Sequence, residues 1–153
     1  MTMKSEVIHR RGAENAEFAE KEVTEAIIAS AIEVHRHLGP GLLESIYQHA
    51  LQHELGLRLL PFRAQVLLPV TYKGQALDGA LRLDLVVDDR VVVEIKAVNA
   101  LEDIHHAQLL SYLRLTGFQT GLLVNFNVPL LKQGIIGRLA NSLRSSAPSA
   151  PLR

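Results

Sequence analysis

The order of its predicted elements places this 153-residue chain in the α/β class, as a three-layer domain with helices on both faces of a central sheet. Two observations predict this class. Two segments with helical periodicity precede three with strand character, and helix, strand and helix patterns then follow in turn. Hydrophobic residues make up 48% of the chain, which is enough for one sizeable core. We therefore expect one domain over 19–143, a flexible arm at 1–18 and a disordered tail at 144–153.

Two helices open the domain. From residue 20 to residue 37, apolar side chains recur at helical spacing, and Gly39-Pro40-Gly41 ends this helix. A second helix is predicted over 42–55, with an apolar side and a stop at Gly56. Residues 1–18 lack sustained periodicity, so a mobile arm with a helical end is expected there.

The rest of the chain alternates between strand and helix patterns. Lys73-Gly74-Gln75 separates two strand candidates as a hairpin turn would, and Gly117 stops a later helix. These elements are strands at 64–72, 76–87 and 91–98, a helix at 102–115, a strand at 119–125 and a last helix at 130–143.

The composition narrows the classes of function. The chain has no cysteine, so a disulfide framework and a thiolate metal site are excluded, and any metal would be held by oxygen or imidazole. No apolar stretch is long enough to span a bilayer, so we expect a cytoplasmic protein without a membrane partner. Sixteen basic residues balance 16 acidic ones, which counts against a dedicated high-affinity DNA-binding protein.

The most informative segment is 82–97, where charged residues interrupt two otherwise apolar strands. One strand carries Arg82 and Asp84, and the next carries Glu94 and Lys96. Ionised groups in apolar strands are costly, so these residues are candidates for a function. The alternate positions are predicted to form an apolar core face, made of Leu81, Leu83, Leu85, Val87, Val91, Val93, Ile95 and Ala97.

The loop between these strands decides whether the charges meet. If Asp88-Asp89-Arg90 is a three-residue loop, Asp84 lies directly opposite Glu94, and carboxylates that close repel unless something positive lies between them. A divalent cation held by oxygen ligands would fit there, with Lys96 beside it. A two-residue loop would put the carboxylates on opposite faces and remove the site. The alternative is an ordinary amphipathic hairpin whose polar face carries solvated salt bridges. Helices on both faces of the sheet would cover the face with Asp84 and Glu94, which counts against this alternative.

Other polar residues are weaker candidates on their own. Gln108 and Tyr112 are one turn apart on a predicted helix, so both could point at one ligand, although Tyr112 could also be a packing residue. Glu44 lies in the first turn of the second helix, where its negative charge would stabilise the helix by interacting with the helix dipole, without any further role. The sequence has no Gly-rich phosphate loop and no serine in a nucleophile elbow.

The histidines favour surface positions. His49 and His53 are one turn apart, but the Glu that a metalloprotease motif requires beside the first histidine is absent. His105 and His106 precede Gln108 by a turn or less and could reach a substrate phosphate, but a polar surface position is favoured.

Five short motifs occur in order along the chain. They are Gly41-x-x-Glu44-x-x-Tyr47, Arg82-x-Asp84, Glu94-Ile95-Lys96-Ala97, Ala107-Gln108-Leu-Leu-x-Tyr112 and Gly121-Leu-Leu-Val-Asn125-Phe126. Together they resemble the family called GxxExxY proteins, which is assigned to the PD-(D/E)XK nuclease superfamily. The resemblance covers about residues 22–127, and the order of five motifs makes it more specific than any single one. It implies a restriction-endonuclease-like fold, with a central mixed β-sheet flanked by helices.

The resemblance also implies a metal site. Asp84 and Glu94 would bind Mg²⁺ or Mn²⁺, helped by the carbonyl of Ile95. Lys96 would orient the attacking water.

Further roles are implied for the neighbouring helices. Gln108 and Tyr112 look like the Gln-x-x-x-Tyr element of RecB-like nucleases, and Glu44 takes the place of the helical acid of many relatives. Two residues depart from the pattern: Leu83 stands where the superfamily has proline, and Asn127 stands where the family has glycine. Neither is a proposed ligand.

Two hypotheses of function follow. The first is a metal-dependent nuclease that hydrolyses phosphodiester bonds of DNA or RNA, with Asp84, Glu94 and Lys96 around one metal. The second is a catalytically inactive nuclease-fold module for binding or assembly, acting as a homodimer or with another protein. The complete set of two acids and a lysine favours the first, whereas the balanced charge and small size favour the second.

Overall fold

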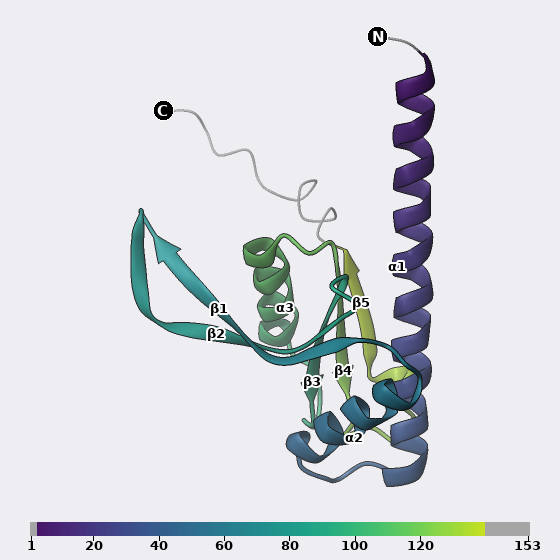
Figure 1. Cartoon of the computed structure of the whole chain (residues 1–153). Coiled ribbons are helices and arrows are strands. Elements are labelled where there is room, and N and C mark those ends of the chain that lie inside the picture. The colour runs from purple at the N-terminus through teal and green to yellow at the C-terminus, as the bar shows by residue number, and fades with distance from the viewer. Residues whose placement is uncertain (1–2, 140–153) are drawn as a thin grey trace.

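The computed structural model describes residues 3–139, which form one five-stranded sheet with helices packed against it (Figure 1). In the sheet, the strands follow their order in the chain, from β1 to β5. The elements are α1 (Met3–Leu38), α2 (Glu44–Leu57), β1 (Phe62–Tyr72), β2 (Gln75–Val87), β3 (Val91–Lys96), α3 (Asp103–Thr116), β4 (Thr120–Asn125), the 3₁₀ turn η1 (Leu131–Gln133) and β5 (Ile135–Leu139).

The sheet is mixed. β3 and β4 are parallel, whereas the other three neighbouring pairs are antiparallel. A parallel pair needs a crossover connection, which α3 supplies. The helix has clear ends: Glu102 and His105 form a capping box at its start, and Gly117 ends it with a φ of 81°.

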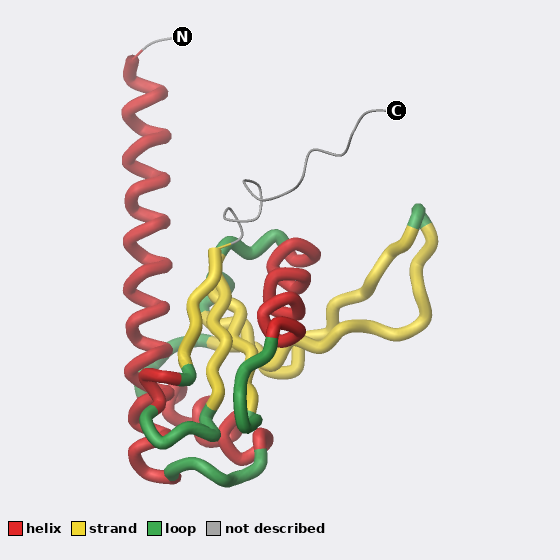
Figure 2. Tube along the Cα trace, turned by 180° about the vertical axis from the view of Figure 1, so that it is seen from behind, coloured by secondary structure: helices red, strands yellow, loops and turns green. Residues whose placement is uncertain are grey.

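Different helices cover the two faces of the sheet, so the fold has the three layers that the sequence predicted (Figures 1 and 2). One core lies between the sheet and the helices α1 and α2, where Ile27 and Leu51 are fully buried. The second lies between the sheet and α3 and includes Leu109 and Leu113. This arrangement is a restriction-endonuclease-like α/β fold.

β2 changes face at Asp84, which corrects the prediction that one apolar face runs along the whole strand. Leu81 and Leu83 pack in the core under α3, whereas Leu85 packs under α1 and α2. Gln65 lies across from Asp84 in β1 and has a φ of 51°. A residue in the left-handed region interrupts the regular alternation of side chains between the two faces of a strand. The β1–β2 hairpin therefore bends at this point, and its apolar side chains lie on the opposite face of the sheet beyond the bend.

The N-terminal segment also differs from the prediction. Residues 3–18, expected as a flexible arm, continue α1 as helix. Val23 and Ile27 anchor α1 in the core, and a helix that is already nucleated gains one hydrogen bond for each residue added. None of the helices within residues 3–139 is long and apolar enough to cross a membrane.

The predicted helix over 130–143 is wrong. Within the described residues, η1 and β5 take its place, and β5 pairs antiparallel with β4. Ile135 and Ile136 are β-branched residues that find a partner strand here, and Gly134 disfavours a helix. Residues 140–143 and the predicted tail at 144–153 lie outside the described part of the chain.

Candidate active site

The loop between β2 and β3 brings two carboxylates to one place. Val87 pairs with Val91, so Asp88, Asp89 and Arg90 form the three-residue loop on which the predicted site depended. The two aspartates adopt φ values of 52° and 49°, a conformation that Asp tolerates better than most residues. The two-residue loop that would have separated the carboxylates is not formed.

The carboxylates replace the backbone ladder where β2 and β3 separate. The last pair of the ladder is Leu85 with Val93. Beyond it, Asp84 Oδ2 accepts a hydrogen bond from the Ile95 N–H at 2.8 Å, and Glu94 Oε1 accepts one from the Asp84 N–H at 3.2 Å. Each carboxylate therefore has one oxygen bound to the opposite strand, and both side chains stay between the strands.

Burial and mutual repulsion keep a proton at this pair. Glu94 is only 3% exposed, and the loss of hydration together with the charge of Asp84 raises its pKa to about 8. The pKa of Asp84 is also raised, mainly by burial, against the opposing effects of hydrogen bonds from Ile95 and Glu94 and of the Lys96 charge. Because Glu94 is this deeply buried, the polar side of the hairpin is not a solvated face with surface salt bridges.

α2 adds a third carboxyl beside the pair. Glu44 is the first residue of α2, and its pKa is raised by partial loss of hydration and by the charge of Asp84. Lys96, the backbone of Ala97 and His105 act in the opposite direction. The Lys96 charge lowers the pKa of all three carboxyls, so the lysine lies on the same side of the molecule as they do, although its ammonium forms no ion pair within 4.0 Å with any of them.

α3 contributes a linked pair of side chains. Gln108 Nε2 donates to Tyr112 Oη at 2.9 Å, one helical turn away, as their four-residue spacing predicts. The pKa of Tyr112 is raised by burial first and then by the charges of Glu94 and Asp84, while the Gln108 bond lowers it. The phenol therefore lies near the two carboxylates, held by the amide.

Gln48 is a further residue of the site, and no motif in the sequence had pointed to it. Its Nε2 donates to the carbonyl oxygen of Asp84 at 3.4 Å, and its Oε1 accepts from Gln65 Nε2 at 2.8 Å. Gln48 thus binds a carbonyl outside the ladder and ties α2 to the bend in β1. The feature of the sequence that could have identified Gln48 is its position four residues after Glu44, on the same face of the helix.

His105 was predicted at the surface. It is the histidine whose charge lowers the pKa of Glu44.

Other motif residues hold the frame around the site. Asn125 Oδ1 accepts from the Val98 N–H at 3.1 Å, and its Nδ2 donates to the Val98 carbonyl at 2.9 Å. The Tyr47 ring stacks on Phe126 with centroids 4.6 Å apart, and its hydroxyl donates to the carbonyl of Gly39. These contacts fix the loops after β3 and α1.

Residues 21–138 match the sequence profile of the PD-(D/E)XK nuclease superfamily. This chain belongs to that superfamily. The matched range contains every candidate site residue named above. The solved structure titled "Crystal structure of SSO0001" is 21% identical, with a TM-score of 0.45, and the similarity covers 90% of this chain and 73% of that one. No curated protein matches the chain.

PD-(D/E)XK nucleases typically use divalent metals, and the donor atoms here fit a hard cation. Asp84 and Glu94 offer carboxylate oxygens. The Ile95 carbonyl points to the same side as its N–H, which binds Asp84, because both groups of a strand residue face one neighbour. Among residues 3–139, no three His, Asp or Glu side chains gather around one metal position. The protein would therefore supply two carboxylates and a carbonyl, with water and phosphate completing the shell, as is usual for Mg²⁺.

Proposed function

We propose that this protein is a divalent-metal-dependent nuclease that hydrolyses phosphodiester bonds of DNA or RNA. The observation that carries the proposal is the pair Asp84 and Glu94, two carboxyls buried against each other across β2 and β3, with the Lys96 charge acting on both. Burying two acids that repel each other costs stability, which a cation bound between them offsets. Membership of a nuclease superfamily supports the reaction class.

Mg²⁺ or Mn²⁺ is the cofactor that these ligands favour, held by Asp84, Glu94 and the carbonyl of Ile95. Such a cation supplies Lewis-acid chemistry: it polarises a phosphate oxygen and lowers the pKa of bound water. The hydrogen bonds from the Ile95 and Asp84 amides orient the two carboxylates before any ligand arrives.

The surrounding side chains would act on the nucleophile and the phosphate. Lys96 follows Glu94 by two residues on β3, so both belong to one face of the strand, where the ammonium can orient the attacking water. Tyr112 is a neutral phenol that can donate a hydrogen bond, its raised pKa favours that form further, and Gln108 holds its oxygen. Glu44 is the additional carboxyl for holding a proton or a water molecule on the α2 side.

Within the superfamily, we assign the protein to the GxxExxY proteins, the family that its five ordered motifs resemble. The motif Gly41-x-x-Glu44-x-x-Tyr47 supports this assignment, because Glu44 and Tyr47 each have a distinct role in the structure. Glu44 joins the charges of the site, whereas Tyr47 binds the loop that precedes α2.

The experiment is a cleavage screen with Mg²⁺ and Mn²⁺ on single- and double-stranded DNA and RNA. Lys96→Ala should keep metal binding but lose most of the rate, and Asp84→Ala should lose both. Lys132→Ala, a change of the same kind at an exposed lysine of η1, is the matched control and should cleave like the wild type. Equal cleavage by wild type and Lys96→Ala would mean that another enzyme in the preparation was responsible.

The second candidate is an inactive nuclease-fold module for binding or assembly. The balance of 16 basic and 16 acidic residues favours it, since a nuclease needs positive charge along its substrate path. Metal binding and normal folding without cleavage of any of the four substrates would make this the better assignment.

A further inference from the structure

α1 runs past the sheet as an isolated helix. Every residue from 12 to 18 is exposed, and the helix continues back to Met3 (Figure 1). At 1.5 Å per residue, the stretch from residue 3 to residue 18 is about 24 Å long. The helix is anchored in the core by Val23 and Ile27, but residues 12–18 lack the packing from which most of the stability of protein helices comes. These exposed residues therefore offer a surface on which a partner can pack.

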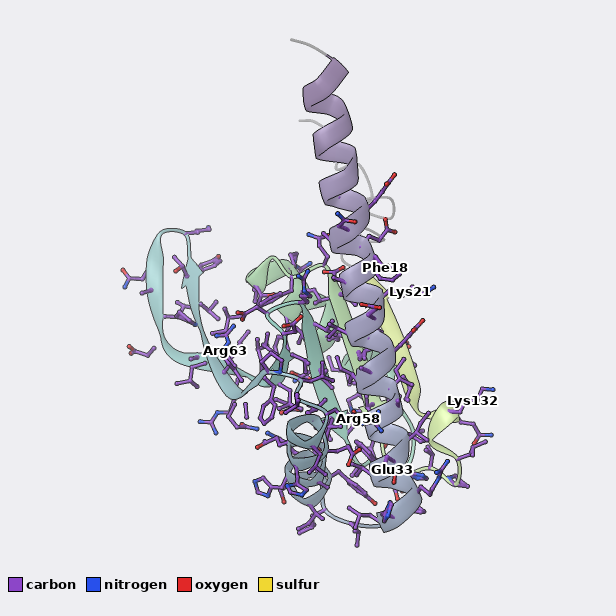
Figure 3. All side chains as sticks on the ribbon, turned by 45° about the vertical axis from the view of Figure 1, so that its right-hand side comes forward. Phe18, Lys21, Glu33, Arg58, Arg63 and Lys132 are labelled. Carbon is purple, nitrogen blue, oxygen red and sulfur yellow. The ribbon has the colours of Figure 1, made fainter. Side chains whose placement is uncertain are left out.

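A groove of about 690 Å³ lies where this stretch meets the sheet. On the sheet side it is lined by Thr120, Leu122 and Gly137. Phe18 belongs to the α1 side and is 62% exposed, and Figure 3 labels it near the middle of the helix, close to Lys21. The residues of α1 that line the groove are Glu14, Glu17, Phe18, Glu20, Lys21, Thr24 and Glu25. The groove thus combines apolar side chains with a row of carboxylates, and it contains none of the candidate site residues.

The charges of α1 are divided into two blocks along the helix. Residues 14–25 carry five glutamates and only one lysine, whereas residues 4–11 carry Lys4, Arg10 and Arg11 against a single Glu6. Two copies of this helix side by side in the parallel direction would bring like charges together. In the antiparallel direction, the basic block of each copy meets the acidic block of the other.

We propose that two copies of this chain associate through antiparallel α1 helices, with the basic block of each lying along the acidic groove of the other. The contact is two-fold symmetric, so the same favourable pairing of blocks occurs twice. Both candidate active sites stay outside this contact, because none of their residues lines the groove. The proposal is independent of nuclease activity.

Charge exchange tests the proposal. The acidic reversal is Glu14→Lys with Glu17→Lys, the basic reversal is Arg10→Glu with Arg11→Glu, and a fourfold variant combines them. Mass in solution is measured by analytical ultracentrifugation from micromolar to hundreds of micromolar protein, at low and high salt. We expect a wild-type dimer that weakens with salt, and monomers for each reversal alone. An equimolar mixture of the two reversals, and the fourfold variant alone, should dimerise again. Asp78→Lys, at an exposed position of β2, is the control for a change of charge elsewhere and should dimerise like the wild type.

Several results would overturn the proposal. A wild type that is monomeric at every concentration would rule out the pairing of α1 helices. A dimer that survives both reversals would place the interface elsewhere. Reversals that give monomers but fail to pair when mixed would show that the substitutions act without charge complementarity. Melting temperatures measured in parallel confirm that each variant is folded.

Discussion

Replacing Glu94 by glutamine should stabilise the metal-free protein at neutral and alkaline pH. The amide oxygen can still accept the hydrogen bond from the Asp84 N–H, so the shape of the site is kept. The substitution removes a carboxyl that is buried beside a second one. In the wild type, that carboxyl takes up a proton on folding near neutral pH, because its pKa rises to about 8.

The sign and size of the effect follow from this shift. The pKa of Glu94 is higher in the folded protein than its usual value of 4.5, so between these two values the folded state binds more protons than the unfolded chain. The stability of the wild type therefore falls as pH rises from about 4.5 to about 8. At 1.36 kcal/mol per pKa unit, the full shift corresponds to a loss of roughly 5 kcal/mol in the free energy of unfolding. Part of this loss belongs to Asp84, because the two carboxyls titrate together. With roughly 2–4 °C per kcal/mol, metal-free Glu94→Gln should melt roughly 5–15 °C above the wild type at pH 8. The two proteins should melt at similar temperatures near pH 5.

The assay is a series of thermal melts in EDTA from pH 5 to pH 8.5, repeated with millimolar Mn²⁺. Glu22→Gln, the same chemical change at an exposed position of α1, is the matched control and should follow the wild-type curve. Mn²⁺ at a hundredfold excess over its dissociation constant should add about 2.7 kcal/mol to the wild type and little to Glu94→Gln. Wild-type and Glu94→Gln curves that stay parallel across this pH range, or that shift equally with Mn²⁺, would refute the reasoning.

Three further substitutions test the contacts around the site. Gln48→Ala leaves the Asp84 carbonyl without this donor and should cost about 1–3 kcal/mol in urea unfolding; an unchanged midpoint would mean that the bond contributes nothing. Tyr112→Phe should lower kcat roughly tenfold or more in a cleavage assay with little change in melting temperature, and an unchanged kcat would remove the phenol from the mechanism. Gly134→Ala should cost roughly 1–3 kcal/mol, because its Cβ would overlap the carbonyl oxygen of Asn125; a variant as stable as the wild type would show that β4 and β5 can move apart.

Local rules predicted the central hairpin in part. They allowed a loop of three residues that places Asp84 across from Glu94, and the structure has that loop, whereas the apolar alternation expected along all of β2 changes face at Asp84. The four-residue spacing of Gln108 and Tyr112 likewise predicts a pair on one helical face, which their hydrogen bond shows. In both cases the geometry depends on neighbours in the chain or on one adjacent strand.

The predictions that failed depend on contacts with other elements of the fold. Residues 135–139 form a strand because β4 offers a free edge, which no local pattern reveals. The change of face in β2 depends on the left-handed Gln65 in the opposite strand. Gln48 matters only because the bend removes the Asp84 carbonyl from the ladder. Each of these features becomes visible when the neighbouring element is in place.

The same irregularity that defeated the prediction of β2 creates the site. A regular ladder would pair the Asp84 and Ile95 amides with backbone carbonyls and leave both carboxylates to point away. Because β2 and β3 separate beyond the Leu85–Val93 pair, on the side away from the loop, those two amides bind the carboxylates instead and hold them in the gap between the strands. The acids are therefore both structural ligands of the backbone and the candidate metal ligands. Removing either side chain exposes an unpaired amide as well as losing a charge, so the amide isosteres asparagine and glutamine, and not alanine, separate the two roles.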